Sequence, residues 1–498
     1  MSVIGEDAAQ PPPVPEPGLG ARAARGALVT GGSQAVRLAV QVLSVVVLAR
    51  FLSPSDYGLV AMVLAVIGVG EILRELGLSP AAVQAPTLSR AQRDNLFWLN
   101  TAAGLLLSCS AAAAAPVIAA MYGRPETLWI ALALSPTFTT SGLATQYRAD
   151  LTRRMRFVDL AVAEVVASVV SLAAGLAAAA SGMGYWSLVV QQVLSGVVVL
   201  VLYVARAGWV PGWWSRAAPM RDLLTFGWSV LGSQLLTYAG NNLDSAIIGA
   251  RFGAAELGLY NRGLQLIRVP MNQMRAPMTT VAQPVLASLQ SDRRRFLEFA
   301  SRAQLAVCYP ILAALALVVA APGPIAHVAL GDRWLGITPY LRLVAIGEAA
   351  ATLSFVGYWM YLSLGLGRAL LRFTAWTVVV RIAAILVGAA FGPLGAATAY
   401  AAVPSGVWLV SLWQIGRVSG LPTGRLIANV LRVLAVTSLA SLAAWGAGLW
   451  FRPASAWSAL LLAGGAFLVA FALAGVVPRV RRDLREMVSA AALVRRRA

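Results

Sequence analysis

The sequence predicts an all-α membrane protein that crosses the bilayer many times. Of its 498 residues, 59% are hydrophobic and only 12% are charged, whereas soluble domains carry about 25% charged residues. The apolar residues fall in runs of about 20 or more, the length that spans the hydrocarbon core as a helix. The short alternating strands of an outer-membrane barrel do not occur. These observations exclude a soluble enzyme and an extracellular disulfide scaffold.

We expect about fourteen transmembrane helices. Residues 1–20 are rich in proline and lack an apolar core, so we expect a disordered cytoplasmic tail there and not a signal peptide. The expected spans are 27–50, 57–78, 95–121, 127–147, 157–181, 184–205, 222–250, 257–288, 296–320, 337–364, 369–391, 394–416, 426–450 and 455–477.

The arginines predict the orientation of these spans. The formal net charge is +19. If the N-terminus is cytoplasmic, most loop arginines fall on the cytoplasmic side, as the positive-inside rule requires. We therefore expect both termini in the cytoplasm. Charge in short loops between spans indicates topology and not nucleic-acid binding. The outer loops hold only Arg50, Arg124, Arg251, Arg333 and Arg452.

An internal repeat of about 200 residues divides the chain. Residues 49–51 and 250–252 both read Ala-Arg-Phe, and Gly58 and Gly258 follow them. The segment before each carries four polar residues at 3-4-3 spacing, which places them on one helix face. They are Gln34, Arg37, Gln41 and Ser44 in the first segment, and Gln234, Thr237, Asn241 and Asp244 in the seventh.

Because six spans is an even number, the two repeats share one orientation. Such duplicated bundles are a common transporter architecture, with the substrate site between the halves. The repeat predicts two lobes of six helices and two further helices. The expected boundaries are 1–20 for the tail, 21–205 for the N-lobe, 206–221 for a cytoplasmic linker, 222–416 for the C-lobe, 417–477 for the last two helices and 478–498 for a basic cytoplasmic tail.

Arginines inside the predicted spans are candidate substrate ligands. Arg37, Arg268 and Arg275 lie on polar helix faces in opposite lobes, and Arg381 lies deep in its span. Charged groups in a bilayer usually face a cavity or a partner, and guanidinium groups bind phosphate oxygens bidentately. Buried ion pairs with Glu71, Glu164 or Glu348 are the alternative. The polar residues expected beside these arginines are Gln34, Gln41, Gln265 and Asn272.

Acidic residues in the spans are candidates for coupling to H+ or Na+. Asp244 is the one acid on the polar face of the seventh segment, next to Asn241. Carboxylates in transporters often hold a coupling ion; Asp244 could equally balance an arginine of the eighth segment. Glu71 and Glu348 are further candidates. We expect no metal site and no cofactor, because one histidine and two separate cysteines provide no ligand cluster.

No catalytic motif is present: the sequence has no phosphate-binding Walker loop, no HExxH and no GxSxG in a suitable context. We therefore expect a protein that is not an enzyme.

Several segments resemble the Wzx-type polysaccharide flippases of the multidrug/oligosaccharidyl-lipid/polysaccharide (MOP) superfamily. They are ARFLSPSDYGLVAMV, GLSPAAVQ, LSRAQRDNLFWLN, NNLDSAIIGARFGAAELGLYNRGLQL and VAQPVLASLQSDRRRF. The resemblance covers about residues 25–420. It implies two six-helix lobes arranged in a V, as in the related MATE transporters. It also implies a location in the inner membrane of a bacterium. There the protein would transfer undecaprenyl-diphosphate-linked oligosaccharide by alternating access from the inner to the outer leaflet, for polysaccharide or lipopolysaccharide biosynthesis. The cationic cavity of that family would fall on Arg37, Arg268, Arg275 and Arg381.

Three other functions remain open from the sequence. A MATE-like drug or cation antiporter would need an acid-lined cavity. A scaffold that does not transport would recruit a polysaccharide polymerase or glycosyltransferases through its basic loops. A flippase for the peptidoglycan precursor would share the fold.

Overall fold

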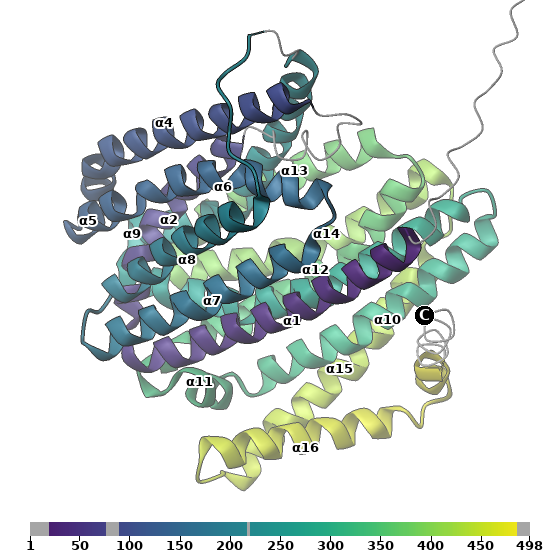
Figure 1. Ribbon diagram of the computed structural model, residues 1–498. Coiled ribbons are helices and arrows are strands. Elements are labelled where there is room, and N and C mark those ends of the chain that lie inside the picture. Colours follow the sequence, from purple (N-terminus) through teal and green to yellow (C-terminus); the bar gives the residue numbers. More distant parts are fainter. Residues whose placement is uncertain (1–18, 76–88, 217–219, 486–498) are drawn as a thin grey trace, which may run out of the picture.

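The computed structural model describes residues 19–75, 89–216 and 220–485, and these residues form helices joined by short turns without any strand. Figure 1 shows long helices that run side by side. A helix lies at each of the expected segments. Nine helices in the described part of the chain are long and apolar enough to cross a membrane. The protein is a multi-pass membrane protein; the total of fourteen crossings stays a prediction.

The first group contains seven helices, and proline and glycine set several of their ends. The helix α4 begins after a capping box at Ser89 and ends at Gly123, which has a φ of 62°. The expected span 127–147 is divided in two because Pro136, which lacks a backbone N–H, begins a new helix. The bounds are α1 Leu19–Phe51, α2 Pro54–Glu75, α4 Arg90–Tyr122, α5 Glu126–Leu134, α6 Pro136–Arg153, α7 Phe157–Ala180 and α8 Trp186–Ala207.

The second group begins with α9, Arg221–Ser288, which contains two of the expected spans. Its backbone breaks at Gly253, where φ is 85° and ψ is −178°, a conformation that favours glycine. The interval 321–336, expected to be a loop, forms two short helices. The bounds are α10 Arg293–Ala320, α11 Pro322–Leu330, η1 Asp332–Ile337, α12 Thr338–Ser363, α13 Gly367–Gly388, η2 Ala389–Phe391, α14 Pro393–Ser419, α15 Gly424–Phe451 and α16 Ala456–Ala474.

The helices associate as two bundles. In the first, α7 packs on α1 and α8, and α6 packs on α4 and α8. In the second, α12 packs on α9, α10 and α14. The helices α15 and α16 pack against each other, with α15 also on α10, and form the lower edge of Figure 1. The exact limits of the two lobes stay a prediction.

The two bundles meet where α2 crosses α9. An added Cβ at Gly58 would lie 1.6 Å from the carbonyl oxygen of Ala254, and one at Gly258 would lie 1.9 Å from that of Pro54. Only glycine allows this close approach of the two backbones. A hydrogen bond adds to this contact between the bundles: the indole N–H of Trp334 donates to the Ala49 carbonyl over 2.9 Å.

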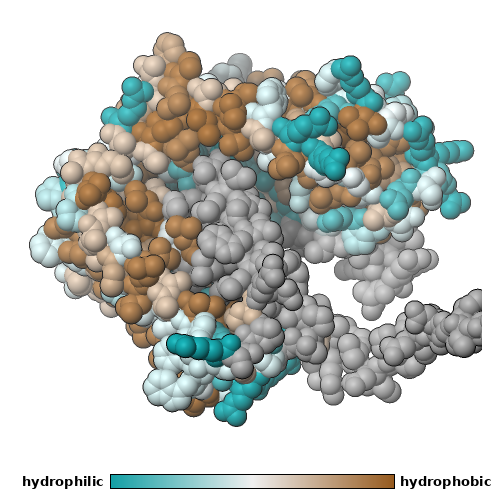
Figure 2. Space-filling model, turned by 90° about the horizontal axis from the view of Figure 1, so that it is seen from above, coloured by the Kyte–Doolittle hydropathy of each residue, from teal (hydrophilic) through white to brown (hydrophobic). Residues whose placement is uncertain are grey.

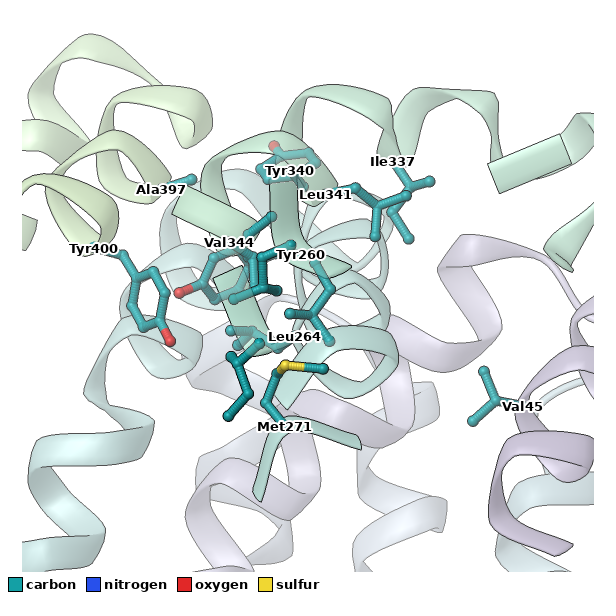
Figure 3. Close-up of a cluster of buried hydrophobic side chains, with 14 of the residues drawn as sticks. Val45, Tyr260, Leu264, Met271, Ile337, Tyr340, Leu341, Val344, Ala397 and Tyr400 are labelled. Atoms are coloured by element: carbon teal, nitrogen blue, oxygen red, sulfur yellow. The ribbon is translucent and has the colours of Figure 1, made fainter. Parts of the chain in front are cut away.

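A hydrophobic core extends through both bundles, and apolar side chains also cover much of the outside. In Figure 3, Tyr260, Leu264 and Met271 of α9 lie near Val344 of α12 and Tyr400 of α14, while Val45 lies apart from them on α1. Figure 2 shows broad brown areas on the surface, with the teal hydrophilic side chains gathered in separate clusters. An apolar exterior is expected for a protein surrounded by lipid.

Candidate functional site: a polar cavity between the bundles

A cavity of about 450 Å³ lies between the two bundles and has a largely polar lining. It begins beside the contact of α2 with α9, because Tyr57 and Gly258 both line it. The polar lining residues come from α1, α7, α8 and α9: Arg37, Gln41, Ser44, Ser168, Ser171, Gln191, Gln192, Ser195, Asn261, Arg262 and Gln265.

The polar face of α1 points into this cavity, as its spacing predicts. Arg37, Gln41 and Ser44 are separated by four and three residues and all line the cavity. The amide of Gln191 on α8 donates to the Ser44 hydroxyl over 2.9 Å, which fixes one side of the lining. Hydroxyl and amide groups of this kind can both donate and accept hydrogen bonds.

A second cavity of about 250 Å³ continues from the first, with Arg37, Ser168 and Ser195 in both linings. Arg37 forms an ion pair with Glu164 of α7, and its side chain remains 38% exposed. Glu164 also accepts a hydrogen bond from Tyr203 over 3.1 Å. Arg148 lies 3.7 Å from Glu164 and is more than half exposed. Two arginines therefore share one carboxylate here and carry one excess positive charge.

Arg262 also lines the first cavity, although its position in the sequence did not mark it as a candidate ligand. Its side chain is 8% exposed, and its guanidinium carbon lies 3.3 Å from the centre of the Tyr57 ring, a cation–π contact across the two bundles. It also donates to Gln265 over 2.7 Å. Within the described residues no carboxylate pairs with it. The signal was present, because Arg262 lies three residues before Gln265, a spacing that places both side chains on one helix face.

Arg268 lines a third cavity of about 270 Å³, which shares Ala61, Leu64, Asn261 and Gln265 with the first. Arg268 also belongs to a buried network in the second bundle. Its Nε lies 3.3 Å from Glu348, and its Nη2 donates to the Tyr400 hydroxyl over 2.7 Å. This arginine thus lies between the cavities and the protein core.

Arg275 lies inside that core network. Its side chain is 5% exposed and pairs with Glu348 at 2.9 Å, and it donates to Thr352 over 2.6 Å. Arg275 is absent from the lining of the three joined cavities. This arrangement is the buried ion pair that the sequence left open as an alternative.

Asp244 and Arg381 are neighbours in the same bundle. Asp244 is 1% exposed and accepts a hydrogen bond from Tyr260 over 2.6 Å. The Arg381 guanidinium lies 3.8 Å from Asp244 and packs near the Tyr400 ring. Tyr260 and Tyr400 lie side by side in Figure 3, with ring centres 6.3 Å apart. Asp244 is thus next to an arginine of α13, whereas balance by the eighth segment was the expected alternative.

The other predicted site residues are more scattered. Gln34 on α1 and Asn272 on α9 are exposed and are absent from the three cavity linings. Glu71 is half-buried on α2. The side chain of Asn241 lies outside the described residues. Among the described residues, no three His, Cys, Asp or Glu side chains gather as a metal site.

The joined cavities can hold a ligand that is both anionic and rich in hydroxyl groups. In the first two of these cavities, Arg37, Arg148 and Arg262 provide three positive charges against the single charge of Glu164. Guanidinium groups bind phosphate oxygens through paired hydrogen bonds. The serine and amide side chains suit the hydroxyls of a sugar chain.

Comparison with known proteins places these features in a family. A family model described as "Polysaccharide biosynthesis protein" matches residues 47–339. The chain is 26% identical to the Teichuronic acid biosynthesis protein TuaB of Bacillus subtilis, over 83% of this chain and 87% of that protein. It is 22% identical to the Lipopolysaccharide biosynthesis protein WzxC of Escherichia coli, over 60% of this chain and 61% of that protein. It is 23% identical to the Succinoglycan biosynthesis transport protein ExoT of Rhizobium meliloti, over 76% of this chain and 77% of that protein.

Solved structures share the fold. The Lipid II flippase MurJ in an inward closed conformation superposes with a TM-score of 0.72 at 12% identity, over 90% of this chain and 99% of that chain. An inward-facing multidrug resistance MATE transporter of the MOP superfamily superposes with a TM-score of 0.62 at 15% identity, over 77% of this chain and 95% of that chain. The expected all-helical, MATE-like fold is therefore confirmed.

Proposed function

Because this chain belongs to the family of polysaccharide biosynthesis proteins, we propose that it is a flippase for a lipid-linked oligosaccharide. It moves undecaprenyl-diphosphate-linked oligosaccharide from the inner to the outer leaflet of a bacterial cytoplasmic membrane. Relatives named for teichuronic acid, lipopolysaccharide and succinoglycan biosynthesis support this function.

The observation that carries the proposal is the cavity between the two bundles. It joins a hydroxyl- and amide-lined space to arginines with excess positive charge. A cavity for organic cations would need the opposite sign of charge. The polarity of this cavity favours the flippase over the drug or cation antiporter.

The diphosphate docks on Arg37 and Arg148, where two guanidinium groups share Glu164. The sugar chain occupies the larger cavity among the serine and amide side chains. The polyprenyl chain stays in the surrounding lipid, because burial of its apolar surface in a polar cavity would be unfavourable. Arg268, which lines the third cavity, meets the far end of the substrate.

Transport proceeds by alternating access. The contact of Gly58 with α9 closes one end of the cavity, and Tyr57 with Arg262 covers the same end from inside. Separation of α2 from α9 at this contact opens the cavity to the other side of the membrane. Rocking of two repeats around a central site is a common mechanism among transporters.

Coupling to H+ or Na+ acts through Asp244. This buried carboxylate holds Tyr260 and lies beside Arg381. Binding of a proton or cation at Asp244 would weaken its attraction to Arg381 and so change the packing of α9 against α13. Glu348 acts as the structural counter-charge of Arg268 and Arg275.

The chain performs no chemical reaction on its substrate. Both termini lie in the cytoplasm, as the distribution of arginines over the loops favours. The basic C-terminal tail is on the side where a polysaccharide polymerase or glycosyltransferase complex would assemble lipid-linked sugars. These partners stay proposals.

Mass spectrometry of lipids that copurify with the protein tests the proposal. Wild type should retain a polyprenyl-diphosphate glycan, and both Arg37→Gln and Arg148→Gln should retain at least tenfold less, because each variant removes one charged phosphate ligand. Arg124→Gln, an exposed change outside the cavities, is the matched control. Equal retention in all four proteins would remove the phosphate site from these arginines. Wild-type export of organic cations with no lipid-linked glycan retained would favour the antiporter.

A further inference from the structure

A further polar pocket lies away from the three joined cavities, where α15 begins. Its volume is about 300 Å³, and it is enclosed by α10, the first turns of α15 and the helical residues 478–485. The packing of α15 on α10 is visible at the lower right of Figure 1. The pocket is lined by Ser301, Leu305, Arg425, Ala428, Asn429, Arg432, Arg479, Arg482 and Asp483.

Hydrogen bonds fix the floor of this pocket. Arg432 binds Asp483 through two bonds, from Nε at 2.5 Å and from Nη2 at 2.9 Å. Asn429 accepts from Arg432 over 2.8 Å and donates to Ser301 over 2.7 Å. Asn429 and Asp483 are both buried. A bidentate pair supported by neighbours holds its geometry, so the pocket is a built feature and not a gap between mobile side chains.

The pocket has a large excess of positive charge. Four arginines line it with one aspartate, a net charge of 4 − 1 = +3. In the part of the chain that the structure describes, Asp483 pairs with Arg432, and no carboxylate pairs with Arg425, Arg479 or Arg482. These three side chains belong to exposed residues.

The helix dipole adds to this charge. Arg425 lies in the first turn of α15, and that turn holds no acidic residue. A helix N-terminus carries partial positive charge, so arginine is unfavourable there unless an anion is close. The first turn of α15 therefore places a cation where a bound anion would be favourable.

An apolar surface continues from the pocket along α15. Leu439 and Leu442 are 64% and 60% exposed, and they lie about three and four helical turns after Ala428 on the same face. In a multi-pass membrane protein such a face contacts acyl chains. A ligand here can thus be anionic at one end and apolar along its length.

We propose that this pocket binds the phosphate headgroup of an anionic membrane lipid, whose acyl chains lie along α15. Arginines bind phosphate with paired donors, and basic pockets between membrane helices are suited to anionic lipid headgroups. The site is separate from the transport cavity and does not depend on the proposed function.

Lipid binding to the purified full-length protein tests this proposal. The probes are phosphatidylglycerol, zwitterionic phosphatidylcholine and inorganic phosphate, with binding measured by native mass spectrometry. The double variant Arg479→Gln/Arg482→Gln removes two lining charges. Its matched control, Arg481→Gln/Arg485→Gln, removes the same charge from the same helical segment at exposed positions outside the lining.

We expect wild type to bind phosphatidylglycerol at least tenfold more tightly than phosphatidylcholine. Arginine near an anionic lipid surface contributes a factor of about five, so the lining variant should lose roughly 25-fold, and the control less than threefold. Equal losses in both double variants would show a diffuse basic surface and overturn the pocket. Unchanged binding in the lining variant with an unchanged melting temperature would overturn it as well. Binding of inorganic phosphate in the pocket without any preference for phosphatidylglycerol over phosphatidylcholine would assign the pocket to a free anion and overturn the lipid ligand.

Discussion

Gly58 of α2 and Gly258 of α9 lie where the two helices approach very closely. At each glycine, the backbone of the opposite helix occupies the space that a side chain would need. A Cβ at Gly58 would meet the Ala254 carbonyl, and a Cβ at Gly258 would meet the Pro54 carbonyl. These pairs exchange under an offset of 200 residues. Such reciprocal contact is expected at a two-fold axis, so the internal repeat places its own symmetry axis at this crossing.

Gly58→Ala should destabilise this closed end. The added methyl group would lie 1.6 Å from a backbone oxygen, and overpacking of this kind costs about 1–3 kcal/mol. We expect a lower melting temperature and a lower yield of disulfide between cysteines introduced on α2 and α9 beside the crossing. Gly446→Ala in α15 is the control, because nothing lies within 4 Å of its Cβ position. Equal behaviour of the two variants would contradict the assigned crossing.

Glu348→Gln should destabilise the second bundle. The change leaves Arg268 and Arg275 without their shared carboxylate, and removal of one partner from a buried pair costs about 3–5 kcal/mol. Chemical unfolding in detergent measures the loss. The control Glu298→Gln breaks an exposed pair with Arg294 and should cost at most about 1 kcal/mol. A small effect at Glu348 would mean that the network does not hold the bundle together.

Arg262→Gln should separate stability from transport. The change removes a buried charge that no described carboxylate balances, so the melting temperature should stay constant or rise. Transport should fall about tenfold, since one charged contact is worth roughly this factor. Arg251→Gln, at an exposed position of α9, should change neither the melting temperature nor the transport rate. A fall in stability together with activity would indicate that Arg262 only supports the contact with Tyr57.

Asp244→Asn should remove the dependence of transport on an ion gradient. Its side chain could still accept from Tyr260 but would lose its charge beside Arg381. The measurement compares the transport rate with and without an imposed H+ or Na+ gradient. Asp292→Asn keeps a helix cap at the start of α10 and should retain the gradient response. A full response in Asp244→Asn would assign this residue a structural role alone.

The sequence was sufficient for the all-helical class and for the positions of the long helices, because hydropathy and repeat spacing are local or periodic signals. Of the four residues in the 3-4-3 stripe on α1, Arg37, Gln41 and Ser44 line the cavity, whereas Gln34 does not. The break of the fourth span at Pro136 could have been read from the proline itself. The short helices in 321–336 were missed because they are too short to show a hydrophobic period.

The partners of each arginine could not be predicted in the same way. Periodicity places Arg262, Arg268 and Arg275 on one side of a helix but does not say what packs there. Over the 13 residues from Arg262 to Arg275, an α-helix rises about 20 Å, so one stripe runs from the cavity into the core. Arg275 therefore meets Glu348, 73 residues away in the chain.

Translocation in proteoliposomes measures the proposed flippase activity itself. The protein is reconstituted with a fluorescent undecaprenyl-diphosphate oligosaccharide, and the fraction of the label that becomes accessible on the opposite leaflet is followed with time. We expect rapid transfer by wild type and by Arg124→Gln, and transfer at least tenfold slower with Arg37→Gln or Arg148→Gln. Wild-type transfer no faster than in protein-free vesicles, or full transfer by both cavity variants, would contradict it.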